Sequence, residues 1–183
     1  MRRFAIFALA LTLGAPACDD DSPTGPSNSG PIVFTAELRA SNEVPAVSNA
    51  ESNGQGTATI TFSVPRDGSG NVTGGGTWNV QAVISGLTND SFIRLSHIHT
   101  GAAGVGGPVF VDTKLIPANQ IPTPGGAATI NFEGVDITQS QAQAVLNNPA
   151  GYYFNMHSPL NPGGVVRGQL VRSEPADLRD LVR

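Results

Sequence analysis

The chain is poor in the residues that most often carry crosslinks or chemistry. It has one cysteine in 183 residues, so no internal disulfide can form. Aromatic residues make up 6% and charged residues 13% of the chain, with a formal net charge of −4. It has no basic stripe, so the electrostatic footprint of nucleic-acid binding is missing and no nucleic-acid partner is expected. Beyond residues 4–13 there is no long apolar run, which argues against a transmembrane protein.

The start of the chain has the features of an export signal. Two arginines precede the apolar residues 4–13, a run too short to span a bilayer but of the right length for a signal-peptide core. Cleavage after Ala17 would leave Cys18 at the new N-terminus, where bacterial lipoproteins carry their lipid. We therefore expect a signal peptide over residues 1–17 and lipidation of Cys18. Without lipidation, the protein would be secreted.

Composition divides the rest of the chain into three parts. Residues 18–30 are acidic at first and then rich in Ser, Gly and Pro, so they cannot bury enough apolar surface to fold and are predicted to be a flexible tether. Residues 31–172 suit one domain with a single core. Residues 173–183 form a charged tail that we expect to fray. The predicted location is outside the cytoplasm, on a bacterial membrane that holds the lipid anchor.

Residues 31–172 are dominated by strand patterns. In residues 57–64 apolar side chains alternate with threonines, the period of a half-buried strand. Segments rich in Gly, Pro, Asn and Asp separate this strand from others of the same kind. The predicted fold class is all-β, an antiparallel Greek-key β-sandwich or barrel of the immunoglobulin or superoxide-dismutase type with about eight strands. The other expected strands are residues 34–40, 77–84, 91–99, 108–115, 127–134, 151–158 and 164–171.

One short helix is expected to interrupt the strands, over residues 137–149. Thr138 is followed three residues later by Gln141, which is the spacing of a helix-capping box. Three apolar residues in the next turns share one face, and Pro149 ends the pattern. A helix of this length serves as a cover for the core and leaves the all-β prediction unchanged.

Two of the three histidines lie in one short segment. His97 and His99 are two residues apart, so on a strand both rings point to the same face. His157 lies on another strand, on the polar face opposite the core-facing Phe154. If the two strands are neighbours, three imidazoles converge and suit Zn²⁺ or Cu²⁺ with an open fourth position. The alternative is structural, with the rings bonding backbone carbonyls and bracing the glycine-rich residues 101–107.

Three separated motifs resemble the CHRD domain, which is named for the vertebrate protein chordin and is common in exported bacterial proteins. They are EVP at residues 43–45, HIHTG at residues 97–101, and NMH at residues 155–157 followed by RGQL at residues 167–170. They occur in the family's order, and the resemblance covers about residues 33–170. It implies an all-β exported module without a settled activity.

The histidine pair also resembles the copper-binding strand of Cu/Zn superoxide dismutases. Those enzymes use more histidines than the three found here, so dismutase activity is not expected. Glu43 and Arg167 are charged residues within otherwise apolar or glycine-rich motifs. We expect them to form a partly buried ion pair that joins the first strand to the last, with the attraction offset by desolvation. The alternative is that they contact a ligand.

Two functions follow from these features. The sequence contains no nucleophile elbow, zinc-protease motif or phosphate loop, so the first hypothesis describes a protein that is not an enzyme. It is a membrane-tethered CHRD module for binding or structure, with no cofactor and with a protein, glycan or envelope component as partner. The alternative is a copper- or zinc-binding protein, either a metal carrier or a weak redox enzyme, that uses His97, His99 and His157.

Overall fold

The computed structural model describes residues 30–115 and 119–173. The predicted signal peptide, Cys18, almost all of the tether and residues 174–183 lie outside them. Within the described part, one antiparallel sheet dominates, in the order β6-β5-β9-β10-β1-β2-β3-β8, with β11 also paired to β1. Its strands are β1 (Ile32–Arg39), β2 (Gln55–Ser63), β3 (Gly76–Ser85), β5 (Leu95–Thr100), β6 (Val109–Asp112), β8 (Ala128–Ile137), β9 (Tyr152–His157), β10 (Val166–Gln169) and β11 (Val171–Ser173).

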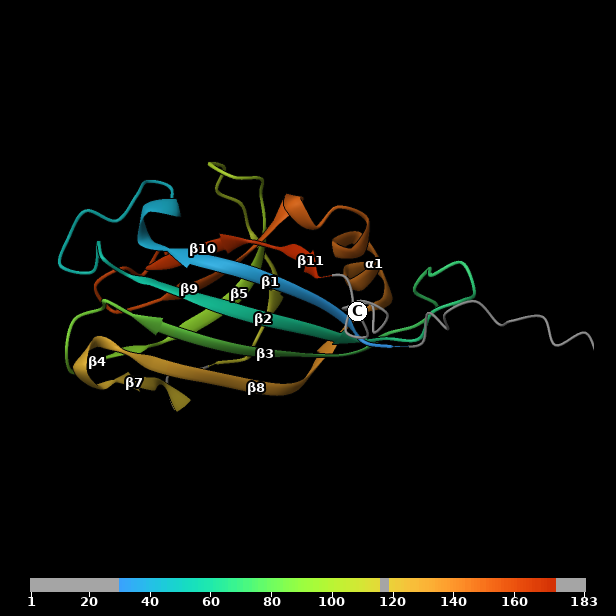
Figure 1. Ribbon diagram of the computed structural model, residues 1–183, viewed down its shortest axis with the longest axis horizontal. Coiled ribbons are helices and arrows are strands. Elements are labelled where there is room, and N and C mark those ends of the chain that lie inside the picture. Colours follow the sequence, from blue (N-terminus) through green and yellow to red (C-terminus); the bar gives the residue numbers. More distant parts are fainter. Residues whose placement is uncertain (1–29, 116–118, 174–183) are drawn as a thin grey trace, which may run out of the picture.

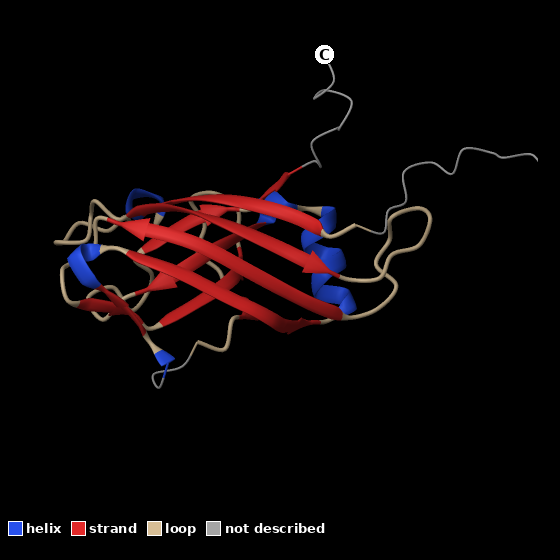
Figure 2. Cartoon of the chain, turned by 60° about the horizontal axis from the view of Figure 1, so that its bottom comes forward, coloured by secondary structure: helices blue, strands red, loops and turns tan. Residues whose placement is uncertain are grey.

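The sheet curls around its core into a nearly closed barrel, with β6 and β8 as its two edges (Figures 1 and 2). All of its strand pairs are antiparallel, so the predicted all-β antiparallel class is confirmed. A second sheet holds only the short strands β4 (Ser91–Ile93) and β7 (Ile121–Thr123). The described residues also include the 3₁₀ turns η1 (Ala40–Asn42), η3 (Pro124–Gly126) and η4 (Pro149–Gly151).

Two expected strands are each divided in the structure. Residues 91–99 do not form one strand, because the chain changes partner at Arg94, so that β4 pairs with β7 while β5 pairs with β9. Residues 164–171 are divided at Leu170 into β10 and β11, both of which pair with β1. The strand β7 was not expected. Local alternation indicates extended backbone but carries no information about a change of partner, which explains these differences.

The expected helix is present as α1 (Gln139–Asn147). Its capping box is formed, with the Thr138 hydroxyl accepting from the Gln141 N–H at 3.2 Å and the Gln141 side chain accepting from the Thr138 N–H at 3.0 Å. Ala142 and Val145 are fully buried against the core. The Gln141 amide donates to the carbonyl of Phe110 at 2.7 Å, which ties the helix to β6. None of the described helices has the length and apolar character needed to cross a membrane.

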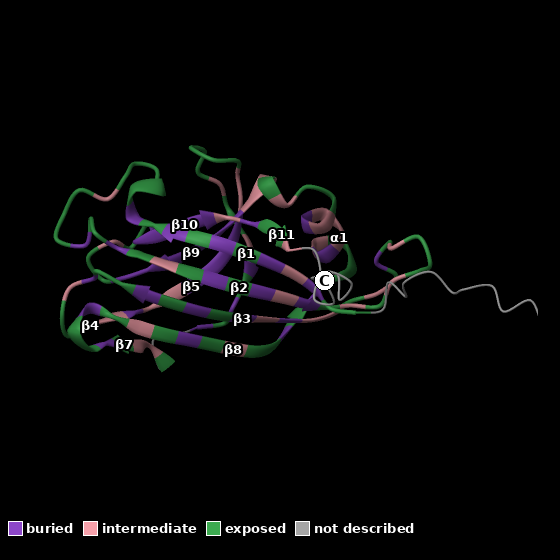
Figure 3. Cartoon of the chain, in the orientation of Figure 1, coloured by how far each residue is buried: buried purple, intermediate pink, exposed green. Residues whose placement is uncertain are grey.

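Half of the barrel follows the simple alternation that the sequence predicts. Along β1, β2 and β3 nearly every second residue is buried, while the residues between them are exposed or partly exposed. The inward side chains include Phe34, Ile60 and Trp78, all of which are fully buried. These strands supply most of one wall of the core, and their outer face is in contact with water (Figure 3).

The other half is buried on both faces. Residues 96–99 of β5 and 153–157 of β9 are all buried. Ile98 and Phe154 point into the core, as their strand positions require. The outer face of β5 and β9 was expected to be polar. Its side chains are mostly polar, but it is covered and not exposed to water. Loops lie over this outer face, and the histidines are beneath them.

Candidate metal centre

The three histidines meet on the outer face of β5 and β9. The antiparallel pairing of these strands sets His97 opposite Asn155, which is two residues from His157. His99 is two residues further along β5, so all three rings project from the same side of the sheet. The strands β5 and β9 are direct neighbours. The convergence of the three rings requires this pairing, and the sequence alone does not show it.

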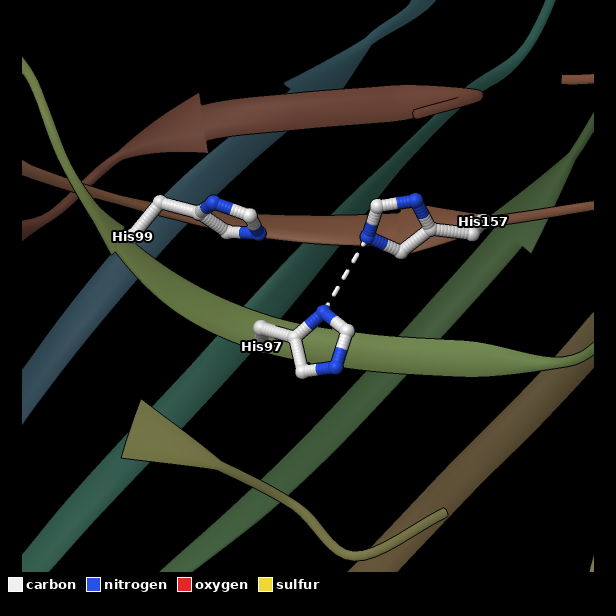
Figure 4. Close-up of side chains that lie close together, drawn as sticks. All are labelled: His97, His99 and His157. Carbon is white, nitrogen blue, oxygen red and sulfur yellow. Dashed lines mark hydrogen bonds between the residues drawn. The ribbon is translucent and has the colours of Figure 1, made fainter. Parts of the chain in front are cut away.

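The three rings converge on a common point. His97 Nδ1 lies 3.1 Å from His157 Nε2, and one ring nitrogen from each histidine lies within 4.8 Å of the others. Their exposed fractions are 7%, 7% and 5% for His97, His99 and His157. Figure 4 shows the rings turned toward one another, with the contact between His97 and His157 as a dashed line.

Two of the rings are oriented by backbone carbonyls on their outer side. His99 Nδ1 lies 3.0 Å from the carbonyl oxygen of Gly107, and His157 Nδ1 lies 3.0 Å from that of Pro162. Because a carbonyl only accepts, each Nδ1 carries the proton and donates it. Each Nε2 of the neutral rings therefore has a free lone pair, and it is these nitrogens that face the centre of the cluster.

His97 has a carboxylate on its outer side. It pairs with Asp112 on the neighbouring strand β6, and its Nε2 lies 3.6 Å from the Asp112 carboxylate. Without a metal, a proton on His97 Nδ1 can bridge to His157 Nε2. With a metal at the centre, that proton belongs on His97 Nε2, facing Asp112. Histidines that bind metals usually have such an outer acceptor.

The Nε2 atom of His99 is buried and has no hydrogen-bond partner among the residues that the structure describes. A buried nitrogen of this kind costs free energy, on the order of 1–3 kcal/mol, unless something occupies the position that it faces. In this case it faces the other two imidazoles. A cation bound between the three rings would satisfy it.

Burial keeps the three rings neutral. It lowers the pKa of His157 to about 4, with repulsion from His97 as the next cause. The pKa of His97 and that of His99 are also lowered below 6.5, in each case mainly by burial. Neutral imidazole is the form that binds a metal ion, so the cluster is ready to do so at neutral pH.

A stack of side chains supports His99. The ring of Tyr153 lies parallel to that of His99, at 9° and with 5.0 Å between ring centroids. The guanidinium carbon of Arg167 lies 3.6 Å from the centroid of the Tyr153 ring. Arg167 also donates to two carbonyls of the 101–107 loop, at 3.1 and 3.2 Å. This is the loop whose Gly107 orients His99, so Arg167 holds both the ring stack and the loop.

The expected pair of Glu43 and Arg167 is close but is not a direct ion pair among the described residues. Glu43 is only 8% exposed. In the described part of the chain one of its carboxylate oxygens has no hydrogen-bond partner, and the other accepts from the Asn155 amide at 3.5 Å. Burial raises the pKa of Glu43 to about 7, against the attraction of Arg167. The Arg167 guanidinium instead donates to the loop carbonyls and lies over the Tyr153 ring. Both charged residues line a surface cavity of about 290 Å³.

Several residues of the site were not singled out from the sequence. Tyr153, Asp112 and the carbonyl of Pro162 come to the cluster through strand register and through a loop, neither of which leaves a local pattern. The expected bracing of the glycine-rich loop is confirmed at Gly107. From the sequence, convergence of the three rings and bracing of loops by the rings are alternatives. The structure shows both for His99 and His157, because each of these rings directs one nitrogen to a backbone carbonyl and the other to the centre of the cluster.

Fold and site together define a small antiparallel β-barrel domain with a buried cluster of three histidines. The model of the CHRD domain matches residues 34–170, so the chain belongs to the CHRD domain family. This range contains the three histidines, Glu43 and Arg167. A search of curated proteins finds no match for the chain.

Proposed function

We propose that this CHRD domain binds a copper or zinc ion through His97, His99 and His157. One observation carries the proposal: the three inner nitrogens converge while each outer nitrogen faces an acceptor. Structural bracing alone requires the outer contacts but not the convergence of buried lone pairs. Imidazole nitrogen is a ligand that both copper and zinc accept.

The spacing of the nitrogens supports the same proposal. Two nitrogens bound to one tetrahedral zinc at 2.0–2.1 Å are about 3.3 Å apart. His97 Nδ1 and His157 Nε2 are 3.1 Å apart, and the third nitrogen is within 4.8 Å of both. Binding of a metal ion would draw this third nitrogen closer to the other two. Three protein ligands leave a fourth position for water or for a ligand that is being transferred.

The surroundings of the domain form part of the proposal. Lipidation of Cys18 would tether the domain outside the cytoplasm, at a bacterial membrane, and a free thiol would leave it secreted. A tethered metal site of this kind acts as a holder or carrier and not as a catalyst. Its partners would be metal ions and the envelope protein or glycan that delivers or receives them.

The metal site is tested by titration of protein purified without an affinity tag. Zn²⁺ and Cu²⁺ are added to the wild type, to His99→Ala and to the exposed control Thr59→Ala, and binding is followed by calorimetry and native mass spectrometry. Loss of one of three ligands should weaken binding at pH 7.5 by about 100-fold or more, whereas the control should match the wild type. Equal and weak binding by the wild type and His99→Ala would reduce the histidines to loop braces.

The anchor is tested separately in cells. Labelled fatty acid should be incorporated into the wild type, and Cys18→Ser should release the protein from the membrane fraction. Wild-type protein that is soluble and carries an unmodified thiol would refute the anchor and leave the metal site untouched.

A further inference from the structure

We infer that the three-histidine site is built for monovalent copper in preference to a divalent ion. The inference rests on the proposed metal function and deepens it by naming the ion. Three features carry it: the charge of the ligand set, the burial of the cluster, and the charges placed around it.

The ligand set brings no negative charge. The candidate metal-binding group among the described residues consists of three histidines, without a carboxylate or a thiolate. A divalent ion held by three neutral imidazoles keeps its full charge of +2 in a site where each histidine residue is at most 7% exposed. Cu(I) would keep a charge of only +1, and the cost of burying a charge rises steeply with its size.

A buried cation stands behind His99. Arg167 is 2% exposed, and its stacking on Tyr153 places the guanidinium carbon no more than about 9 Å from the centre of the His99 ring. Its N–H groups are directed to carbonyls and an amide oxygen, which do not cancel its charge. This charge is one of the causes that lower the pKa of His99, so it acts on the cluster.

A second cation lies at the other end of the cluster. The backbone N–H of Arg94 donates to the carbonyl of His157 at 2.9 Å, which sets Arg94 at the point where β5 begins beside β9. Repulsion from Arg94 contributes to the lowered pKa of His157. Two arginines therefore act on the cluster, one from β10 and one from the residue that precedes β5.

The nearby acids compensate this charge only in part. Asp112 lies beside His97, but its side chain is 56% exposed, so water screens it. Glu43 makes no direct ion pair with Arg167, and burial holds its carboxyl partly protonated near neutral pH. Among the charged side chains that act on the pKa values of the three histidines, two are arginines and one is the carboxylate of Asp112. At about 10 Å and an effective dielectric constant near 20, one buried positive charge weakens binding by about ten-fold for each unit of charge on the ion.

The experiment compares two ions on the same protein. Affinity for Cu(I) is measured without oxygen, with ascorbate present, by competition with bicinchoninate, and affinity for Zn²⁺ is measured by competition with a chromophoric zinc chelator. The wild type should bind Cu(I) at least 100-fold more tightly than Zn²⁺. This ratio should fall by about ten-fold in Arg167→Gln and by about three-fold in the less buried Arg94→Gln. Arg167→Lys, which keeps the charge, should retain more of the ratio than Arg167→Gln.

The ratio of the Cu(I) affinity to the Zn²⁺ affinity is insensitive to misfolding, because a loss of folded protein reduces both apparent affinities alike. Arg39→Gln is the matched control, since Arg39 lies opposite Arg167 on β1 but has an exposed side chain, and its ratio should equal that of the wild type. Binding of Zn²⁺ as tight as or tighter than that of Cu(I) would overturn the inference and leave the metal function standing. An unchanged ratio in both Arg167→Gln and Arg94→Gln would also overturn it. Failure of both ions to bind would remove the inference and the proposed function together.

Discussion

The two halves of the barrel share one core but differ in what covers their outer faces. On β2 and β3 the outward positions are mostly threonine, asparagine, glutamine and serine, largely exposed or partly exposed to water. On β5 and β9 the outward positions are histidine, asparagine, tyrosine and one leucine, and most of them are buried (Figure 3). Burial of a polar side chain is costly unless partners are built around it. The partners around the histidines are therefore the part of the molecule that calls for a functional explanation.

Loops provide the cover, and specific side chains fasten them. Arg167 and Gln169 on β10 donate to carbonyls of Ala102, Val105 and Gly101. Residues 158–164 supply the Pro162 carbonyl to His157. The covered half thus has one more layer than the exposed half, and the histidines lie within that layer. Differences in the response to mutation should follow this extra layer.

The largest expected effect is common to both halves. Phe62 on β2 and Phe154 on β9 are fully buried in the same core, so replacement of either by alanine should lower the free energy of unfolding by about 3–5 kcal/mol. By contrast, Val83→Ala, at an outward position that is 52% exposed, should change it by less than about 0.5 kcal/mol. Urea denaturation measures all three variants. A small effect at Phe154 alone would mean that the covered half does not share the core.

The second prediction concerns the loop over the histidines. A β-carbon on Gly107 would lie 1.9 Å from the carbonyl oxygen of Thr100, so Gly107→Ala must displace the loop. We expect a loss of about 2–3 kcal/mol in stability and a loss of at least ten-fold in metal affinity, because the carbonyl that orients His99 moves. Gly106→Ala is the matched control, since nothing lies within 4 Å of its β-carbon. Equal effects at the two glycines would contradict the bracing role of Gly107.

How far the sequence predicts this molecule depends on the half considered. Alternation of apolar residues and threonines indicates β2 and β3 because their outward positions meet water and are free to be polar. The capping box indicates α1, and strand parity places the histidines correctly relative to Ile98. Sequence alone does not indicate that β5 lies beside β9, because strand order is decided by contacts between distant segments. The positions of Asp112, Tyr153 and the covering loops depend on that order, so they emerge only from the structure.

The third prediction tests a buried carboxyl at the margin of the covered half. The pKa of Glu43 is raised to about 7 from 4.5, so its contribution to stability is complete below pH 4.5 and is lost as the pH rises through 7. Glu43→Gln cannot lose a proton, so at pH 8 it should be about 3 kcal/mol more stable than the wild type, relative to the difference at pH 4. Thermal unfolding from pH 4 to 8 measures the difference between the two proteins.

The histidines act in the opposite direction over part of this range. Their pKa values are lowered on folding, so the stability of both proteins falls as the pH drops below 6.5, where the unfolded rings take up protons. Both proteins contain the same three histidines, so the histidine contribution cancels in the difference between the stability of the wild type and that of Glu43→Gln. Glu37→Gln, at an exposed position on β1, should follow the wild-type profile. A Glu43→Gln profile that runs parallel to that of the wild type would show that folding does not shift the pKa of the Glu43 carboxyl.

The smallest expected effect lies where the edges of the two halves approach each other. Lys114, two residues beyond β6, pairs with Asp136 on β8 at 3.4 Å, and the two side chains are 68% and 85% exposed. Water screens such a pair, so a double-mutant cycle with Lys114→Gln and Asp136→Asn should give a coupling below about 0.5 kcal/mol that 0.5 M salt removes. The edges would then be held together by the shared core and α1, which are common to both halves. A coupling that survives high salt would show that charge closes the barrel, and the difference between the halves would then extend beyond the layer of loops.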